Sequence, residues 1–268
     1  MPEILEHGFM IRALAAGLIV GTLCAALSVI IVLKRLSFAG VGVSHSAFGG
    51  LALGALFGVN LEAAAFIFSA AVALVTSWMT RRGGVSEDVS VGIIFATSMA
   101  IGVAALGLME GYSIDLFSYL FGSILAVSPR DLWLAAGALV IGLAAFGAMF
   151  TRLIAYCFDE EWARVSGVNV DRLEDALMIL VAMTVVISIK LLGIVLVSAL
   201  LVIPGATGYA LARNYRGMMA ISMGSALMAV TAGLVISYYL DIASGAAIVL
   251  SSAALFMLAS LSGSAHRT

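Results

Sequence analysis

The sequence predicts an all-α fold, a polytopic transmembrane helical bundle of about nine spans with one further short helix that is re-entrant or lies on the surface. Of the 268 residues, 63% are hydrophobic and 10% are charged, whereas charged residues make up about 25% of a typical soluble domain. The mean hydropathy is +1.18. Charge-poor segments also recur along the whole chain, each close to the roughly 20 residues that a helix needs to cross hydrocarbon. These observations exclude a soluble globular domain.

The predicted spans follow one another with short connections, so we expect residues 1–268 to form a single transmembrane domain. The nine charge-poor segments are 13–33, 36–61, 63–80, 89–109, 132–151, 173–189, 191–212, 218–240 and 245–261. A further apolar segment, 116–127, has only about a dozen residues, which are too few to cross the membrane. We therefore expect this segment to be re-entrant or to lie on one face of the membrane.

Basic residues set the expected orientation, because Lys and Arg in short loops stay on the cytoplasmic side. If the amino terminus is outside, ten of the thirteen basic residues fall inside, namely Lys34, Arg35, Arg81, Arg82, Arg152, Arg164, Arg172, Arg213, Arg216 and Arg267. We expect a multi-pass protein of the cell (inner) membrane, with its carboxyl terminus in the cytoplasm. The first apolar run is followed by Lys34 without a small-residue cleavage site, so we expect it to be a retained anchor.

Glycines in the second span predict a close contact between helices. Gly50, Gly54 and Gly58 recur every four residues. Such a ridge lets a neighbouring helix approach closely enough for van der Waals contact between the backbones. We expect a packing role for these three residues and no role in binding substrate.

Pro204 lies inside the predicted span 191–212 and predicts a kink or break there, because proline removes a backbone hydrogen bond and clashes with the preceding turn. Broken helices at membrane depth are tolerated where protein or a water-filled cavity satisfies the freed carbonyl groups. The span is therefore expected either to line a substrate path or to carry a passive kink.

A hydrophilic island interrupts the membrane pattern at residues 157–175, which hold eight of the chain's 28 charged residues. Within it, Phe158, Trp162 and Val165 recur at steps of four and three residues, which predicts an apolar stripe on a short cytoplasmic helix. Gly167 is expected to end that helix. A stripe of this kind outside the membrane needs a partner protein to cover it. The alternative is a solvated loop between two spans.

The same island contains the predicted start of the next span. Asp171 and, three residues later, Glu174 resemble a capping box, in which two side chains bond the free amide groups of the first helical turn. The span that would begin there is 173–189.

No motif for nucleotide binding or catalysis is present. The only lysines, Lys34 and Lys190, are preceded by Leu33 and Ile189, so the chain has no G-x-x-x-x-G-K-[ST] loop. It also lacks H-E-x-x-H and G-x-S-x-G, its two cysteines form no C-x-x-C motif, and no basic run indicates nucleic acid. We expect a chain that is not an enzyme and binds no cofactor. If ATP drives the protein, a separate subunit must bind it.

Several stretches resemble one known family. They are LKRLSFAGVGVSHSAFGGLALG (33–54), DLFSYLFGSILAVSPRDL (115–132), GVNV (167–170), LGIVLVSALLVIPGATGYALAR (192–213) and DIASGAAIVL (241–250). In this order they resemble the zinc/manganese permease family of ATP-binding-cassette importers, which is related to permeases of the cobalamin and metal-chelate type. The similarity runs from about Leu14 to Leu261.

The resemblance implies a homodimer in membrane lipid with one translocation path at its interface. It also implies two cytoplasmic ATPase subunits, and an extracytoplasmic metal-binding protein that delivers the substrate, zinc or manganese. The island at 157–175 matches the coupling segment of such permeases. Phe158, Trp162, Val165 and Gly167 are therefore the expected ATPase contacts.

The resemblance also places candidate metal residues. The histidine of the second-span motif falls on His45, and the aspartate that opens D-L-x-x-Y-L-F-G falls on Asp115. Glu110, five residues earlier, is a weaker candidate at the same outer mouth, and both carboxylates could instead cap a short helix. Related permeases commonly have an aspartate four residues before the histidine, where this chain has Val41. Because residues at i and i+4 share a helix face, Val41 removes one expected ligand and leaves the identity of the metal open.

His45 is also a candidate from its position alone. It is the only histidine in a predicted span and lies nine residues past Leu36, roughly 13 Å into the membrane. Ionisable groups at such depth are expensive to bury and are usually functional. A neutral imidazole could pass a zinc or manganese ion, and the alternative is a hydrogen bond that holds two helices together.

Other functions remain open. An importer of an organic metal chelate or of cobalamin would need a wide pore with few ligands, which Val41 would suit. A stand-alone ion-coupled transporter should show inverted repeats and paired acidic residues inside the membrane, and the sequence shows neither. A membrane enzyme would need a nucleophile paired with a base, and no such pair stands out.

Overall fold

The computed structural model describes residues 8–82, 84, 86–109 and 127–264, and all regular elements among them are α-helices. Those helices are α2 (Gly8–Leu33), α3 (Ser37–Leu56), α4 (Leu61–Arg82), α5 (Glu87–Gly107), α7 (Pro129–Phe158), α8 (Glu160–Val165), α9 (Val170–Leu192), α10 (Ile194–Leu200), α11 (Ile203–Leu211), α12 (Tyr215–Leu240) and α13 (Ser244–Ser264).

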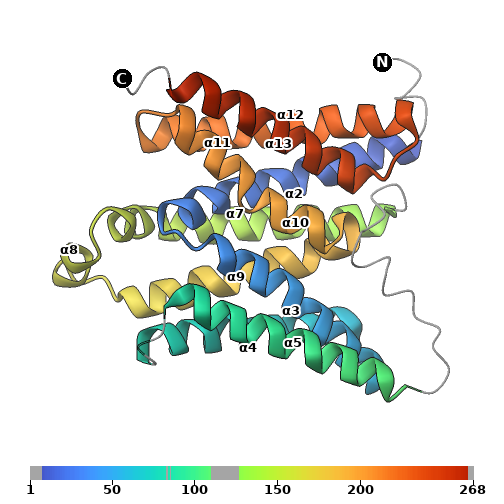
Figure 1. Cartoon of the computed structure of the whole chain (residues 1–268), viewed down its shortest axis with the longest axis horizontal. Coiled ribbons are helices and arrows are strands. Elements are labelled where there is room, and N and C mark those ends of the chain that lie inside the picture. The colour runs from blue at the N-terminus through green and yellow to red at the C-terminus, as the bar shows by residue number, and fades with distance from the viewer. Residues whose placement is uncertain (1–7, 83, 85, 110–126, 265–268) are drawn as a thin grey trace.

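The helices confirm a polytopic membrane bundle. Eight helical segments among the described residues are long and apolar enough to cross a membrane, with α10 and α11 counted as one segment, and α3 adds a shorter apolar helix. Figure 1 shows them running side by side, with α2 beginning at one end of the bundle and α13 finishing at the other. The predicted short helix at 116–127 falls, except for Val127, outside the described residues.

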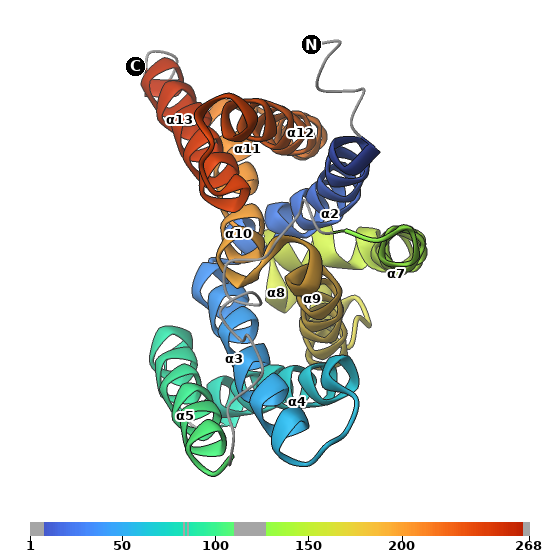
Figure 2. The ribbon, with the colours of Figure 1, turned by 90° about the vertical axis from the view of Figure 1, so that its right-hand side faces the viewer.

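The bundle has a central part and two flanks (Figure 2). On one flank α3 packs against α4 and α5, and on the other α12 packs against α11 and α13. Between them, α2 and α9 are the most buried spans, since 72% and 67% of their most apolar windows lie inside the protein. Most of their apolar residues therefore pack against other helices.

The glycines of α3 allow the close contact with α4. A Cβ atom added to Gly50 would lie 2.7 Å from the Cα of Ala65, and one added to Gly54 would lie 2.8 Å from the Cβ of Ala64. The glycine ridge of α3 therefore packs against α4 of the same chain. For Gly58 the prediction was wrong, because α3 ends at Leu56 and nothing lies within 4 Å of an added Cβ there. Gly58 instead has a φ of 63°, a left-handed turn that glycine makes without strain.

The span with Pro204 is divided into α10 and α11. Pro204 is the second residue of α11, where its missing N–H group removes no helical hydrogen bond. The adjoining Gly205 packs directly on the backbone of Ser28 in α2. A side chain at position 205 would therefore force α11 away from the centre of the bundle.

A tight turn joins α2 to α3. The amide of Leu36 donates to the carbonyl of Ile31 (2.8 Å), and the amide of Arg35 donates to that of Val32 (3.1 Å). This pattern is a Schellman motif, which needs a left-handed residue at its penultimate position. That residue is Arg35, with a φ of 61°, although glycine is the usual choice.

The strain at Arg35 gives a first prediction. Arg35→Val should lower the stability of the folded protein by about 1–2 kcal/mol, because a β-branched residue fits the left-handed region poorly. Arg35→Gly should be neutral or stabilising. The measurement is the thermal midpoint in detergent, with Arg82→Val as the control for charge loss in ordinary helical backbone. Equal midpoints for the Val and Gly variants would contradict the prediction.

The contact between α3 and α4 gives a second prediction. Gly54→Leu should cost about 1–3 kcal/mol through overpacking and should lower the yield of folded protein, without a change in substrate choice. The measurement is the monodisperse fraction after size-exclusion chromatography. Gly137→Leu is the matched control, because nothing lies within 4 Å of an added Cβ at that glycine. A normal yield of Gly54→Leu with altered transport would count against a packing role.

Candidate substrate path and docking surface

His45 lies on α3, partly exposed, and faces α5. Its ring meets that of Phe95 edge to face, with 5.3 Å between the ring centroids and an angle of 73° between the planes. Its Nδ1 atom lies 3.0 Å from the carbonyl oxygen of Val41. A carbonyl oxygen can only accept a hydrogen bond, so this contact places the proton of the neutral ring on Nδ1. The lone pair of Nε2 is then available to a metal ion.

The residues around His45 supply few further ligands. Ser44 and Ser46 are buried, and their hydroxyl groups donate to the carbonyls of Gly40 and Val43 in the same helix (2.8 and 2.7 Å). Among the described residues there is no group of three or more His, Cys, Asp or Glu side chains that could hold a metal ion. The other two candidates, Asp115 and Glu110, lie outside the described residues.

One end of the bundle carries a charge cluster that sequence reasoning missed. The Nζ atom of Lys190 lies 3.0 Å from a carboxylate oxygen of Glu62 and 2.9 Å from one of Asp131. Asp131 also forms a capping box with Ser128 at the start of α7. Lys190 therefore joins the ends of α4, α7 and α9. Pairing between residues so distant in sequence leaves no local signal.

The opposite end of the bundle carries α8. The helix α7 runs on to Phe158, seven residues beyond the predicted span, so Phe158 closes α7 and is not part of the short helix. Asp159 then adopts an extended conformation and caps α8, its carboxylate accepting from the amide of Trp162 (2.9 Å). This one residue separates the two helices.

Three large apolar side chains of this region are exposed. Phe158 is 75% exposed, Trp162 60% and Val165 89%. These three large, exposed apolar side chains lie within eight residues in sequence, and exposed apolar patches mark interaction sites. We call these three residues the α8 apolar patch.

The ends of the neighbouring helices are capped locally. Gly167 has a φ of 87°, and the amide of Val168 donates to the carbonyl of Ala163 (3.0 Å), so α8 ends in a Schellman motif. The predicted capping box at Asp171 was wrong. The cap of α9 is Asn169, whose side chain accepts from the amide of Arg172 (3.1 Å).

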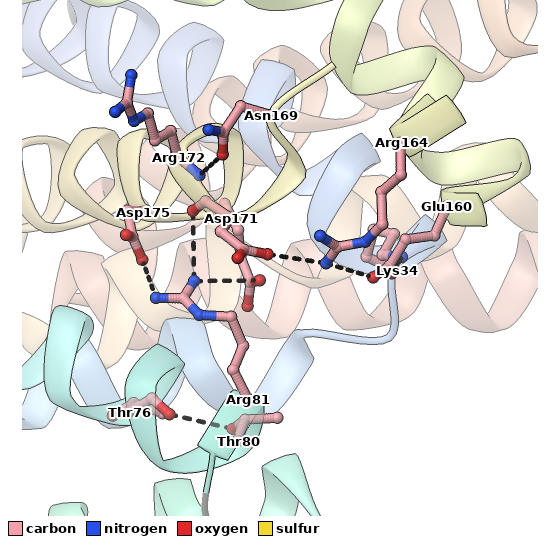
Figure 3. Close-up of polar contacts among 11 residues, drawn as sticks. Lys34, Thr76, Thr80, Arg81, Glu160, Arg164, Asn169, Asp171, Arg172 and Asp175 are labelled. Atoms are coloured by element: carbon pink, nitrogen blue, oxygen red, sulfur yellow. Dashed lines mark hydrogen bonds and ion pairs between the residues drawn. The ribbon is translucent and has the colours of Figure 1, made fainter. Parts of the chain in front are cut away.

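A network of ion pairs connects α8 to its surroundings (Figure 3). Glu160 of α8 pairs with Lys34 at the end of α2 (3.2 Å) and with Arg164 (3.1 Å), and Arg164 pairs with Asp171 of α9 (2.8 Å). Partial burial raises the pKa of the Glu160 carboxyl, but the hydrogen bonds from Arg164 and Lys34 outweigh it and hold that pKa below its ordinary value. The pairs of Glu160 therefore persist at neutral pH and are lost as the pH falls through the lowered pKa.

A second set of contacts at this end involves α4. Arg81 pairs with Asp175 (2.8 Å) and Glu174 (3.5 Å) and donates to the backbone carbonyl of Asp171 (3.3 Å). Glu174, predicted as a capping residue, is instead a partner of Arg81. Figure 3 shows the contact of Arg81 with Asp175. Together the two sets join α2, α4, α8 and α9.

These features define a class of protein. Apolar spans, one of them divided into α10 and α11, and a short helix beyond the spans with exposed apolar side chains are features of the membrane subunit of a transporter. The sequence profile of the ABC 3 transport family matches residues 6–263. The chain belongs to that family.

Relatives of the chain match it from end to end. A manganese transport system membrane protein, MntC of Halalkalibacterium halodurans, is 32% identical over 96% of this chain and 88% of its own length. A high-affinity zinc uptake system membrane protein, ZnuB of Haemophilus influenzae, is 32% identical over 92% of this chain and 94% of its own length.

A solved structure has the same fold. PsaBC from Streptococcus pneumoniae, in complex with a Fab, contains a chain that is 29% identical to this one, with a TM-score of 0.85 over 96% of this chain and 92% of that chain. The family, the expected resemblance and the helical fold are therefore all confirmed.

Proposed function

We propose that this chain is the membrane permease subunit of an ATP-driven importer of divalent metal ions, zinc or manganese. The observation that carries the proposal is the end-to-end match to membrane proteins named for manganese transport and for zinc uptake. The two substrates share a charge and differ in ligand preference, since imidazole suits zinc and carboxylate suits manganese. Importers of a chelate or of cobalamin, and stand-alone ion-coupled transporters, have no such support.

A separate ATPase subunit would drive transport. The sequence has no phosphate-binding loop, and the α8 apolar patch offers a surface to a partner outside the membrane. In this proposal the α8 end of the bundle faces the cytoplasm and the end with Lys190 faces outward, in accord with the bias of basic residues. A homodimer in membrane lipid and an extracytoplasmic metal-binding protein complete the assembly.

His45 would take part in the path of the ion. Its Nε2 lone pair is available because Nδ1 bonds the carbonyl of Val41, and its ring is partly exposed. Few ligands favour passage, because a closed tetrahedral site would hold the ion. Asp115, with Glu110 as the weaker candidate, would receive the ion at the outer mouth.

The proposed ATPase contact gives a third prediction. Trp162→Ala should weaken co-purification of the ATPase subunit and lower metal-stimulated ATP hydrolysis by about ten-fold or more, because exposed aromatic anchors often dominate an interface. Trp133→Ala is the matched control, since Trp133 is 79% exposed at the other end of α7. Full co-purification and stimulated turnover of Trp162→Ala would refute ATPase docking at α8.

The proposed path gives a fourth prediction. His45→Ala in the reconstituted complex should lower zinc and manganese uptake by about ten-fold or more, because the ion loses a ligand at a point where the membrane offers no water. Val41→Asp should favour manganese over zinc, since it adds a carboxylate on the same helix face.

Both variants are measured by uptake of each metal into proteoliposomes, with ATPase activity followed in parallel. Unchanged uptake of both metals by His45→Ala would mean that His45 only packs against α5. Uptake of a metal chelate by the unmodified complex, without uptake of the free ion, would move the assignment to a chelate importer.

A further inference from the structure

The carboxylate of Glu160 bridges two cations from different helices. Its Oε1 atom lies 3.1 Å from Arg164, one turn further along α8, and its Oε2 atom lies 3.2 Å from the Nζ atom of Lys34. Lys34 directly follows α2 and is 126 positions away in sequence. The pair therefore links α8 to a part of the chain that is not its covalent neighbour (Figure 3).

Lys34 is held in place from a second side. Its Nζ atom lies 3.7 Å from the centre of the Tyr156 ring in α7, so the ammonium group is placed between an aromatic face and the Glu160 carboxylate. The Lys34 side chain is only 18% exposed. Salt and water screen such a partly buried pair less than an exposed one.

The space around the pair leaves room for movement. An open cavity of about 690 Å³ is lined by Lys34, Glu160, Trp78 and Tyr156, among others. The packing of α8 is against α7 and α9, to which it is also joined through the chain. The cavity leaves α8 room to move relative to the end of α2, and the ion pair spans the two, so a displacement of α8 would pull on Lys34.

The connection from Lys34 to α3 is short and stiff. Arg35 adopts the left-handed turn, Leu36 is buried, and α3 begins at Ser37. The two hydrogen bonds of the Schellman motif fix this turn to the last turn of α2. A displacement of Lys34 is therefore carried into α3, which contains His45.

We propose that the ion pair between Lys34 and Glu160 is a mechanical link through which movement of α8 displaces the turn from α2 to α3, and with it the helix that carries His45. This inference rests on the proposed function, in which an ATPase subunit docks on α8. Lys34 and Glu160 are positioning residues in it. Neither contacts the metal ion.

The test is backbone hydrogen exchange in the complete complex in lipid nanodiscs, with and without ATP. In the unmodified complex, ATP should change exchange at residues 158–168 and at residues 34–38. Lys34→Met should keep the change at 158–168 and reduce the change at 34–38 by about five-fold or more, the lower range of coupling between sites. Lys34→Met should also lower the number of metal ions moved per ATP hydrolysed.

Further variants separate a link that transmits movement from a pair that only stabilises the fold. Lys34→Arg, which keeps the charge, should restore the change at 34–38. Lys34→Met and Glu160→Gln should be non-additive in combination, because they remove the same pair. Asp171→Asn is the matched control, since it removes the pair between Arg164 and α9 but leaves Lys34 and Glu160 together.

An ATP-dependent change at 34–38 that is equal in the unmodified complex and in Lys34→Met would overturn the link while leaving ATPase docking intact. The link is also overturned, with ATPase docking intact, if Lys34→Met lowers the thermal midpoint but leaves the number of ions moved per ATP unchanged. Absence of any ATP-dependent change at 158–168 in the unmodified complex would overturn the docking proposal and the link together.

Discussion

The interior of a membrane offers no partner to backbone N–H and C=O groups, and the architecture of this protein depends on that constraint. Long helices meet this constraint because their backbone N–H and C=O groups bond to one another. Within the described segment 170–211, the helix is interrupted at Gly193 and at Val202, and the amides of these residues remain bonded to the carbonyls of Ile189 (2.8 Å) and Ala199 (3.1 Å). Leu192, Leu200 and Leu201 beside them are buried. The breaks are therefore tolerated because other helices cover them.

The same constraint confines the charged groups to the two ends of the bundle. Lys190 joins α4, α7 and α9 at one end, and Arg81 joins α4 to α9 at the other. An isolated ion pair at a surface contributes about 0–1 kcal/mol, so these clusters add less than the packing between them. They favour one register of α4 against α9, because sliding of either helix would separate both sets of pairs.

Composition and length predicted the membrane fold well, because hydrocarbon thickness sets the length of each span. Contacts that depend on where a helix ends were predicted less well. Gly58 continues the four-residue spacing of Gly50 and Gly54, yet α3 has already ended there. Asp171 matched a capping pattern, but Asn169 is an equally good cap and comes first in the chain. The pair of Lys34 with Glu160 could not be predicted, since only the folded chain brings those positions together.

In the proposed ion path, the position of His45 suits the demands of transport. A site that stores a metal ion gains from many ligands, whereas a site that passes one must release it, and each added ligand slows release. His45 presents one nitrogen, since the other bonds the carbonyl of Val41 in its own helix. That bond fixes the ring to its own helix, and the edge-to-face contact with Phe95 adds a restraint from α5. Because its hydrogen bond lies within α3, the imidazole would move with α3, and in the proposed path its affinity for an ion would depend on what α3 faces at each stage of a transport cycle.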